Sequence, residues 1–308
     1  MSNSPLLIPP VMVGLGEVLW DIFPSGRLLG GAPANFTYMA NVLGNCGIVA
    51  SRVGNDALGS EACLAMSSLG LDASYVQRDA EHETGTVGVV IDSDGQPTFS
   101  IKESVAWDFL EWTQKWIELS RRADVVCFGS LAQRSSVSAT TIEQFVCNTR
   151  PSTLRICDVN LRRPFYSREA LRTSFRHAHI AKLNDQELPE VASLFGFGSG
   201  DEEVQARRLM DYFGLRLVCV TRGANGSLLV SQEETVERSG VHVKVTDAVG
   251  AGDAFTACLA HYYVRGKSLE EISESANRLA SWIATQKGAM PRIQKARLHE
   301  ILNEVVLE

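Results

Sequence analysis

Short apolar runs alternate with helix-patterned segments along most of this chain. The apolar runs, rich in branched residues, lie at 11–15, 47–53, 124–130, 154–160, 215–221 and 227–230. Between most of them, segments such as 34–44 and 57–70 show apolar residues at helical spacing and end at a glycine. Strands that alternate with helices predict an α/β fold with a mostly parallel central sheet, covered on both faces. Ligands of such sheets bind beyond the carboxyl ends of the strands.

Two segments depart from this alternation and are predicted to be hairpins. They are "LWDIFPSGRLLGG" at 19–31 and "TGTVGVVIDSDGQPTFSIKES" at 84–104, the second turning at "DSDG". Two hairpins among strand-helix units predict a small β-sheet lid that projects from the main domain. The alternative is an edge hairpin with no role in ligand binding. The chain shows no internal repeat and no interdomain linker.

Composition narrows the class of partner. Of the 308 residues, 45% are hydrophobic and 21% charged, which is ordinary for a globular protein. The net charge of −7, with both signs interspersed, gives no basic stripe for nucleic acid and no polybasic membrane anchor. Small molecules or proteins are therefore the expected partners.

The cysteines and the N-terminus predict a cytoplasmic protein. The seven cysteines are scattered without a CxxC pair, as expected of free thiols in a reducing compartment. The N-terminal stretch lacks a basic region, and no apolar run reaches the roughly 18 residues of a membrane span. We expect no targeting segment.

The stretch "TDAVGAGDAFTACLA" at 246–260 carries the strongest chemical signal. The pattern predicts a strand at 241–245 and a helix at 253–264, with Gly250, Ala251 and Gly252 in the turn between them. Free amides at a helix start attract an anion, and glycines let the backbone approach it closely. Asp253 beside them can take a proton from a hydroxyl. The alternative is a helix-capping aspartate behind a tight turn.

Three other chemistries lack their signatures. The only Gly-Lys-Ser, at 266–268, has His261 where a phosphate loop needs glycine, so a loop and a helix start are expected there. Leu19 occupies the third glycine position of a dinucleotide fingerprint, and no HExxH is present.

Further polar clusters suit phosphoryl transfer. Asn184 and Glu187 lie three residues apart, on one face if a helix starts there, and can orient magnesium-bound water. A capping box is the alternative. Thr221, Gly223 and Gly226 form a turn able to meet phosphate, or merely a hairpin.

The N-terminal part of the chain offers polar groups for a ligand with neighbouring hydroxyl groups. Asp21 and Asn35 suit vicinal hydroxyls, and Gly30 and Gly31 suit a hinge below the lid. A turn and a helix start explain the same residues without a ligand. Arg162, after the strand at 154–160, can bind an anionic oxygen or pair with a structural carboxylate.

Together these residues resemble the ribokinase-like carbohydrate kinases, the PfkB family. The resemblance spans nearly the whole chain and rests on six motifs in order, "GGAPAN" (30–35), "RVGNDALG" (52–59), "DVNLR" (158–162), "NDQE" (184–187), "TRGANG" (221–226) and "DAVGAGD" (247–253). Within the family, "GEVLWDIFPSGRLLGGAPANF" and "SVAWD" (104–108) resemble bacterial fructokinases.

The resemblance implies a ribokinase-like three-layer sandwich with a β-sheet lid, as a single kinase domain over 1–308. It also implies transfer of the γ-phosphoryl group of ATP to a sugar hydroxymethyl group, with Mg2+. Asp253 matches the general base, and Gly250, Ala251 and Gly252 match the anion hole. The matches to ligand contacts are Asp21, Gly30, Gly31, Asn35 and Arg162 for the sugar, Asn184, Thr221, Gly223, Gly226 and Asn277 for the nucleotide, and Glu187 for magnesium through water.

Asp247 matches a region that binds potassium in several relatives. The threonines common in that turn are replaced here by Ala248 and Val249, so a K+ requirement stays open. An exposed lid sheet often pairs with a twin, and we expect a homodimer through the lid.

Fructose is the expected acceptor, and other acceptors and functions are alternatives. A 2-keto-3-deoxygluconate kinase would use cations such as Arg27, Lys102 or Arg162, and a nucleoside kinase would use aromatic residues such as Phe99, Trp107 or Phe109. A ribose kinase, a catalytically silent sugar sensor and, last, a nicotinamide oxidoreductase complete the alternatives.

Overall fold

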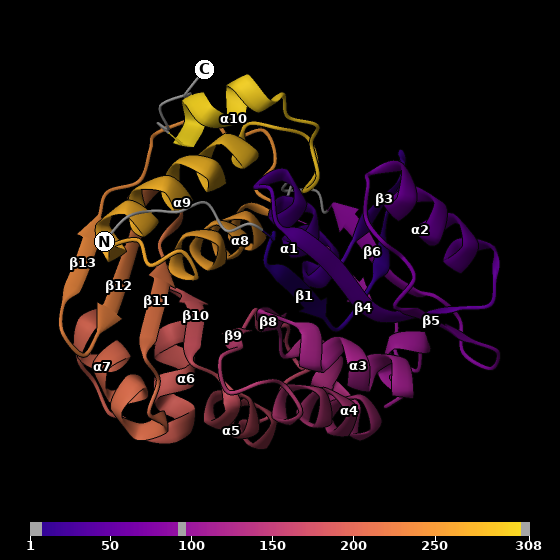
Figure 1. Ribbon diagram of the computed structural model, residues 1–308, viewed down its shortest axis with the longest axis horizontal. Coiled ribbons are helices and arrows are strands. Elements are labelled where there is room, and N and C mark those ends of the chain that lie inside the picture. Colours follow the sequence, from indigo (N-terminus) through magenta and orange to yellow (C-terminus); the bar gives the residue numbers. More distant parts are fainter. Residues whose placement is uncertain (1–7, 92–96, 303–308) are drawn as a thin grey trace.

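A nine-stranded sheet forms the centre of the molecule in a computed structural model that describes residues 8–91 and 97–302 (Figure 1). From one edge to the other the strands are β13 (Thr235–Arg238), β12 (Ser227–Ser231), β11 (Leu217–Thr221), β10 (Ile180–Asn184), β9 (Leu154–Asp158), β8 (Val125–Phe128), β1 (Val11–Leu15), β4 (Cys46–Gly54) and β5 (Val76–Asp79). Only β12 and β13 run antiparallel to their neighbours. The predicted mostly parallel sheet is confirmed.

Helices cover both faces of this sheet. One face carries α1 (Ala32–Val42), α2 (Ala57–Ser68), α8 (Ala251–Tyr263), α9 (Leu269–Ala284) and α10 (Lys295–Leu302). The other carries α3 (Gln114–Arg122), α4 (Ser136–Cys147), α5 (Arg168–His177), α6 (Glu187–Phe195) and α7 (Glu202–Phe213). Successive side chains of β1 enter opposite cores, Met12 with the first set of helices and Val13 with the second. The three-layer prediction is confirmed.

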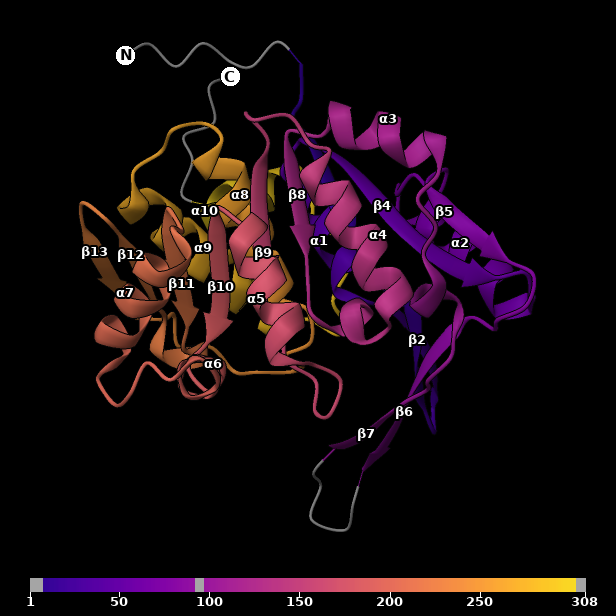
Figure 2. The ribbon, with the colours of Figure 1, turned by 90° about the horizontal axis from the view of Figure 1, so that it is seen from below.

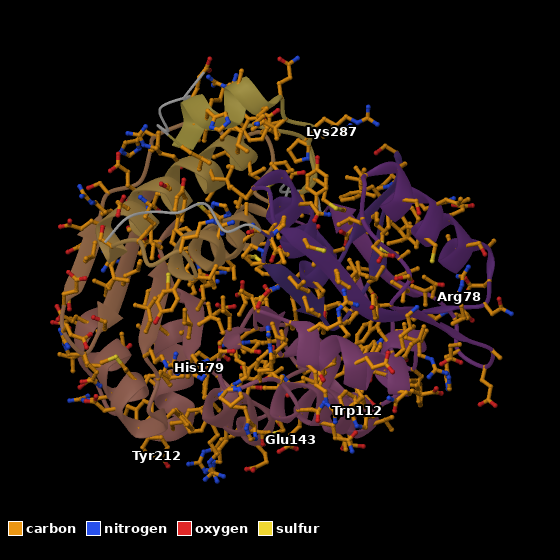
Figure 3. The ribbon with its side chains drawn as sticks, in the orientation of Figure 1. Arg78, Trp112, Glu143, His179, Tyr212 and Lys287 are labelled. Atoms are coloured by element: carbon orange, nitrogen blue, oxygen red, sulfur yellow. The ribbon has the colours of Figure 1, made fainter. Side chains whose placement is uncertain are left out.

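The second helix layer exposes both polar and large hydrophobic side chains on its outer surface. Glu143 on α4 and Tyr212 on α7 lie on its solvent side (Figure 3). Across residues 8–91 and 97–302, no helix is long and apolar enough to cross a membrane.

A second sheet of four strands projects from the main body, as Figure 2 shows. Its strands, in spatial order, are β3 (Gly26–Gly30), β2 (Leu19–Phe23), β6 (Gly85–Ile91) and β7 (Pro97–Ile101). The two hairpins meet through parallel pairing of β2 with β6. Both predicted hairpins are confirmed, although the predicted "DSDG" turn at 92–95 lies outside the described residues.

Two local predictions are wrong. Residues 241–245 form no strand, because all five side chains are exposed and the alternating valines have no buried face to fill. Asn184 and Glu187 do not share a helix face, because Asn184 ends β10 and Glu187 begins α6.

The start of α9 follows its prediction. Ser268 caps this helix in a reciprocal capping box with Glu271, so the Gly-Lys-Ser at 266–268 is a loop and a helix start.

Asp56, from the motif "RVGNDALG", fixes the base of the small sheet. Its Oδ1 accepts hydrogen bonds from the amide of Gly59 at 2.7 Å and from the hydroxyl of Thr84 at 2.7 Å, and its Oδ2 accepts from the amide of Thr84 at 2.8 Å. Burial alone would raise the pKa of Asp56, but the bonds from Thr84 and Gly59 lower it below its usual value. One carboxylate thus caps α2 and holds the segment that leads into β6.

Replacing Asp56 by alanine is expected to lower the free energy of unfolding by about 2–3 kcal/mol at neutral pH, because a cap and two further charge-assisted hydrogen bonds are lost. The lowered pKa of Asp56 means that this stabilisation is present at neutral pH. It is lost as the pH falls below the pKa of an ordinary aspartate. Denaturant titrations at pH 7 and pH 3.5 measure both effects. The exposed neighbour Asn55, changed to alanine, is the control and should stay close to wild type.

Candidate active site

The polar motifs meet at one edge of the large sheet. The parallel strands β1, β9, β10 and β11 end there. The last residues of β9, β10 and β11 are Asp158, Asn184 and Thr221, and Glu17 follows shortly after β1. The N-termini of α1 and α8 start beside this edge. The sequence therefore concentrates carboxylates and helix N-termini in one place.

The first turn of α8 is a bare backbone pocket. Its N-cap is Gly250, at φ 80°, and no side chain of the described residues caps this end. A Cβ at Gly250 would lie 2.3 Å from the Cβ of Ala289, so a side chain does not fit there. No side chain blocks this helix start, where first-turn amides can attract an anion, although the amide of Ala251 donates to the carbonyl of Ala248 at 3.3 Å.

Asp253 lies in this turn and contacts α1. Its Oδ2 accepts a hydrogen bond of 2.7 Å from Nδ2 of Asn35, and the Oδ1 of Asn35 is buried without a partner in the described structure. The pKa of Asp253 is raised to about 6, first by burial and next by the nearby Asp158 carboxylate. The hydrogen bond from Asn35 opposes this shift. A base with such a pKa is ionised at neutral pH and still takes up protons readily.

Glu17 is a second buried carboxyl in the site, and the sequence analysis missed it. Its side chain is almost fully buried, and its carboxyl accepts hydrogen bonds from its own amide and that of Ala32. The pKa of Glu17 is raised to about 7, chiefly by burial, with a further contribution from Asp253. The signal was a glutamate directly after a buried strand, at the carboxyl edge of the sheet.

Asp21 extends the site toward the small sheet. It lies on β2, and burial raises its pKa to about 6, while Arg162 lowers it and Asp247 raises it. A Cβ at Gly30 would lie 2.5 Å from Oδ2 of Asp21, so this glycine makes room for the carboxylate. Arg162 is exposed on the loop after β9.

Gly31 is required by the backbone. Its φ is 106°, in the region that favours glycine, and a Cβ there would lie 2.5 Å from the carbonyl oxygen of Glu17. Its carbonyl accepts the amides of Ala34 and Asn35, which starts α1. This turn therefore sets the position of Asn35.

Asn184 and Glu187 exchange hydrogen bonds across the start of α6. The Oδ1 of Asn184 accepts from the amide of Glu187 at 2.8 Å, and Oε2 of Glu187 accepts from the amide of Asn184 at 2.8 Å. The other oxygen of Glu187 accepts from the amide of Leu161 at 2.7 Å. Burial raises the pKa of Glu187 despite the cation of Lys182. The two bonds have the reciprocal pattern of a capping box, although α6 itself begins only at Glu187.

The hairpin after β11 holds the next set of predicted residues. Thr221 pairs with Asn184 in the sheet, so the two lie side by side. Gly223 begins the short helix η3 (Gly223–Asn225), and a Cβ at Gly226 would lie 1.9 Å from the carbonyl oxygen of Arg238. Gly226 is thus needed for close packing of this hairpin.

Asn277 and Asp247 are held by their own neighbours. Asn277 is buried in α9, and its Nδ2 donates to the hydroxyl of Ser227 at 3.0 Å. The carboxylate of Asp247 accepts from the amides of Val249 and Gly288, each at 3.0 Å. The second contact ties the loop before α8 to the loop after α9.

A buried ion pair underlies the first turn of α8, and the sequence analysis did not single it out. Nζ of Lys182 donates to Oδ1 of Asp158 at 3.0 Å and to Oδ2 at 3.2 Å, and the hydroxyl of Thr256 donates to Oδ2 at 2.7 Å. The signal was a lysine in an otherwise apolar segment that had not been predicted as a strand.

The structure thus brings the predicted residues together in two groups. Asp21, Gly31, Asn35 and Asp253 share one end of the site with Arg162, whose charge lowers the pKa of both Asp21 and Asp253. Asn184, Glu187 and Thr221 lie along the adjoining strand ends. Asn277 lies deeper, behind β12.

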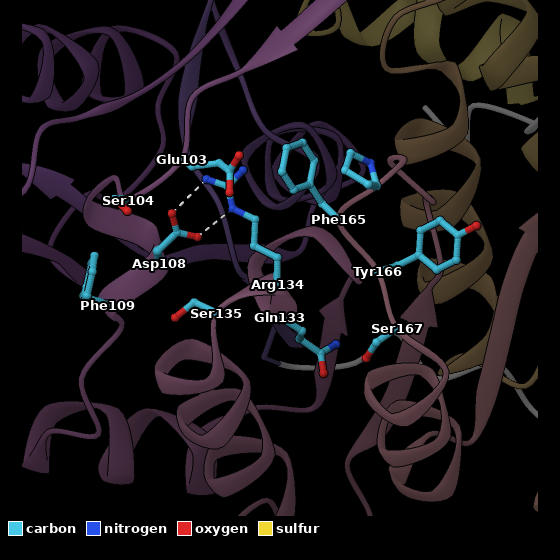
Figure 4. Close-up of a pocket in the computed structure, with 11 residues that line it drawn as sticks. Glu103, Ser104, Asp108, Phe109, Gln133, Arg134, Ser135, Phe165, Tyr166 and Ser167 are labelled. Carbon is cyan, nitrogen blue, oxygen red and sulfur yellow. Dashed lines mark hydrogen bonds and ion pairs between the residues drawn. The ribbon is translucent and has the colours of Figure 1, made fainter.

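A cavity of about 470 Å3 opens between η1 (Ala106–Phe109), η2 (Leu131–Arg134) and residues 164–167 (Figure 4). Phe109, considered above for a nucleoside acceptor, lines it, but none of the residues matched to the sugar, ATP or the base does. Its cation, Arg134, is already bound by Asp108 through two hydrogen bonds of 2.8 Å and is stacked 3.9 Å from the ring centre of Trp107. Trp107 and Asp108 of the "SVAWD" motif therefore hold this arginine, and Trp107 is fully buried.

Known proteins resemble the chain along nearly its whole length. The fructokinase of Escherichia coli is 29% identical over 294 residues, which cover 90% of this chain and 94% of the relative. The ATP-dependent 6-phosphofructokinase of Thermoanaerobacterium thermosaccharolyticum is 25% identical over 265 residues, 86% of this chain and 81% of the relative.

A solved structure and a family model agree with these relatives. A double mutant of the fructokinase of Vibrio cholerae, with fructose, ADP and a potassium ion bound, has a TM-score of 0.78 and 25% identity, covering 96% of this chain and 98% of the other. The model of the pfkB family of carbohydrate kinases matches residues 26–296. This match confirms the resemblance drawn from the six motifs, and the chain belongs to the pfkB family and is an ATP-dependent carbohydrate kinase.

Proposed function

We propose that this kinase is a fructokinase, which transfers the γ-phosphoryl group of ATP to the hydroxymethyl group of fructose. The observation that carries the proposal is the bare first turn of α8, with the Asp253 carboxylate beside it and Asn35 bonded to that carboxylate at 2.7 Å. Two relatives named fructokinase, one of them solved with fructose and ADP, support the acceptor.

Asp253 is the general base of this proposal. Its carboxylate takes the proton from the acceptor hydroxyl as that oxygen bonds to the phosphoryl group. The amides that follow Gly250, at Ala251 and Gly252, meet the charge of the phosphoryl group in transit. Phosphoryl transfer needs alignment and charge neutralisation more than covalent catalysis, and this turn supplies both.

The acceptor sugar is proposed to lie between the small sheet and α1, in contact with Asp21, Gly30, Gly31, Asn35 and Arg162. The Oδ1 of Asn35 is a buried acceptor without a partner, which a sugar hydroxyl would satisfy. Asp21 offers a second acceptor from β2. The small sheet acts as a lid that keeps water from competing as phosphoryl acceptor.

ATP is proposed to occupy the neighbouring strand ends, at Asn184, Thr221, Gly223 and Gly226, with Asn277 in the middle of α9 behind them. Glu187 keeps unused lone pairs although each of its oxygens accepts one amide, so it fits a water of a phosphate-bound Mg2+. We propose that phosphates and water supply most of the ligands of this ion. When bound, Mg2+ would neutralise phosphate charge.

Potassium is proposed to bind backbone carbonyls of the loop that Asp247 organises. The two amide contacts of Asp247 fix this loop just before the first turn of α8. A relative solved with potassium supports the ion, while Ala248 and Val249 remove the hydroxyl ligands of other members.

The cell and the assembly follow from the same reasoning. We propose one kinase domain over 1–308, working in the cytoplasm, where the buried thiols of Cys127, Cys157 and Cys219 stay reduced. The edge strand β3 of the lid exposes Leu28, and a homodimer through the lid would cover it.

Asp253→Asn is expected to lower kcat by at least about 1,000-fold while ATP still binds, because the amide cannot accept the proton. In the wild type, kcat/KM for the acceptor should fall below about pH 6, where Asp253 becomes protonated. A coupled ADP assay and calorimetric ATP titration measure the two properties. Retained turnover in the variant would remove Asp253 from its role.

Fructose is expected to give the highest kcat/KM in a panel with ribose, 2-keto-3-deoxygluconate, fructose 6-phosphate and a nucleoside. Two cations that an acidic acceptor would need are already paired, Arg27 with Glu61 and Lys102 with Glu83. ADP release is the measurement. A preference for 2-keto-3-deoxygluconate or fructose 6-phosphate would contradict the proposal, and sugar binding without ADP release would indicate a sensor.

Glu17→Gln is expected to stabilise the protein at pH 8.5 relative to wild type, by about 1–3 kcal/mol more than at pH 5.5. The pKa of Glu17 in the folded protein is raised to about 7. The wild type therefore loses stability as the pH rises from the lower pKa that Glu17 has in the unfolded chain through the pKa of the folded state. The neutral amide removes this loss. Thermal unfolding at both pH values measures it, and an equal effect at both would show that Glu17 is ionised throughout.

A further inference from the structure

A charged pair lies in the floor of the site, where most neighbours are apolar. The side chains of Lys182 on β10 and Asp158 on β9 are only 8% and 5% exposed. Asp158 also accepts a hydrogen bond from Thr256 on α8, so a single carboxylate joins two strands to the helix that carries the base. Burying an ion pair costs free energy that well-packed apolar residues would not. A role in the chemistry above it would account for the pair.

The pair lies directly beneath the anion pocket. A Cβ built at Gly252 would be 3.0 Å from Nζ of Lys182, so the ammonium group packs against the backbone of the first turn of α8. Thr256 lies one helical turn further along, and its single hydroxyl hydrogen is shared between Asp158 and the carbonyl of Gly252. The cation therefore supports this turn from the side opposite to the expected phosphoryl group.

The two ions act on Asp253 in opposite directions. Asp158 raises the pKa of Asp253, and Lys182 lowers it. Lys182 stays charged, because Asp158, Glu187 and Asp253 raise its pKa against the effect of burial. Other groups act on Asp253 from the surrounding elements, and these are Glu17 after β1, Asn35 on α1, Cys127 on β8 and Arg162 after β9.

We propose that Lys182 and Asp158 are paired positioning residues of the kinase, which fix the first turn of α8 from below and balance the charge beside Asp253. The inference rests on the proposed role of Asp253 as base. Neither residue touches the substrates, and both act through the backbone of Gly252 and the carboxylate of Asp253. The pair is needed as a pair, because either ion alone unbalances the site.

The test is the dependence of kcat/KM on pH in three full-length variants. In Asp158→Asn, the cation is unopposed and the acidic limb of the profile should move to lower pH by roughly one unit. In Lys182→Met, Asp158 and Asp253 face each other without the cation, and the limb should move to higher pH by a similar amount. The double variant should lie between the two single variants.

The double variant and a conservative substitution serve as controls for effects on folding. Asp158→Asn with Lys182→Met leaves no unpaired buried charge, and it should unfold at a higher temperature than Lys182→Met alone. Lys182→Arg keeps the cation and should keep the acidic limb near that of wild type. Asp124→Asn breaks an exposed pair with Arg150 at the opposite end of the sheet and should not move the limb.

Three results separate this inference from the proposed function. Equal limbs in wild type and all variants, with reduced stability alone, would overturn the positioning role and leave Asp253 as base. Shifts of both single variants in the same direction would overturn it as well. A wild type whose pH profile has no acidic limb, combined with full activity of Asp253→Asn, would instead overturn the proposed function. Tight ATP binding in each variant confirms that the variant is folded.

Discussion

The hydrogen bond between Asn35 and Asp253 is the contact on which the site depends. It joins residues 218 positions apart in the chain and ties the start of α1 to the start of α8. Each helix begins at a glycine with positive φ, Gly31 and Gly250, and each of these glycines packs where a side chain would collide. Two helix N-termini are therefore held side by side with a carboxylate between them. Any ligand that enters between them meets helix N-termini and the Asp253 carboxyl together.

Burial of acids around this contact is the second constraint. Glu17, Asp21 and Asp253 all have raised pKa values, chiefly because the fold removes them from water. Such clustering lowers stability and is typical of functional sites. The cations of Arg162 and Lys182 relieve it from the solvent side and from the floor. The buried acids destabilise the protein at this edge of the sheet. The two large hydrophobic cores on either side of the sheet stabilise it.

The sequence predicted the layers, the parallel sheet and the two hairpins, because these follow from local periodicity and turn residues. It also placed Asn35 and Asp253 in one site through their motifs. The strand at 241–245 failed because alternation alone does not show whether a partner strand is available. The roles of Lys182 and Glu17 were not predicted because they come from long-range contacts. A lysine inside a buried strand is informative only once the carboxylate of Asp158, on the next strand, is known to face it.

The small sheet consists of two separate insertions in the chain. One hairpin lies between β1 and α1, the other between β5 and η1, and only the parallel pairing of β2 with β6 unites them. The nine-stranded sheet is complete without either hairpin, and Asn184, Thr221 and the first turn of α8 belong to other connections. Either hairpin can therefore be shortened or lengthened without removing a strand from the nine-stranded sheet.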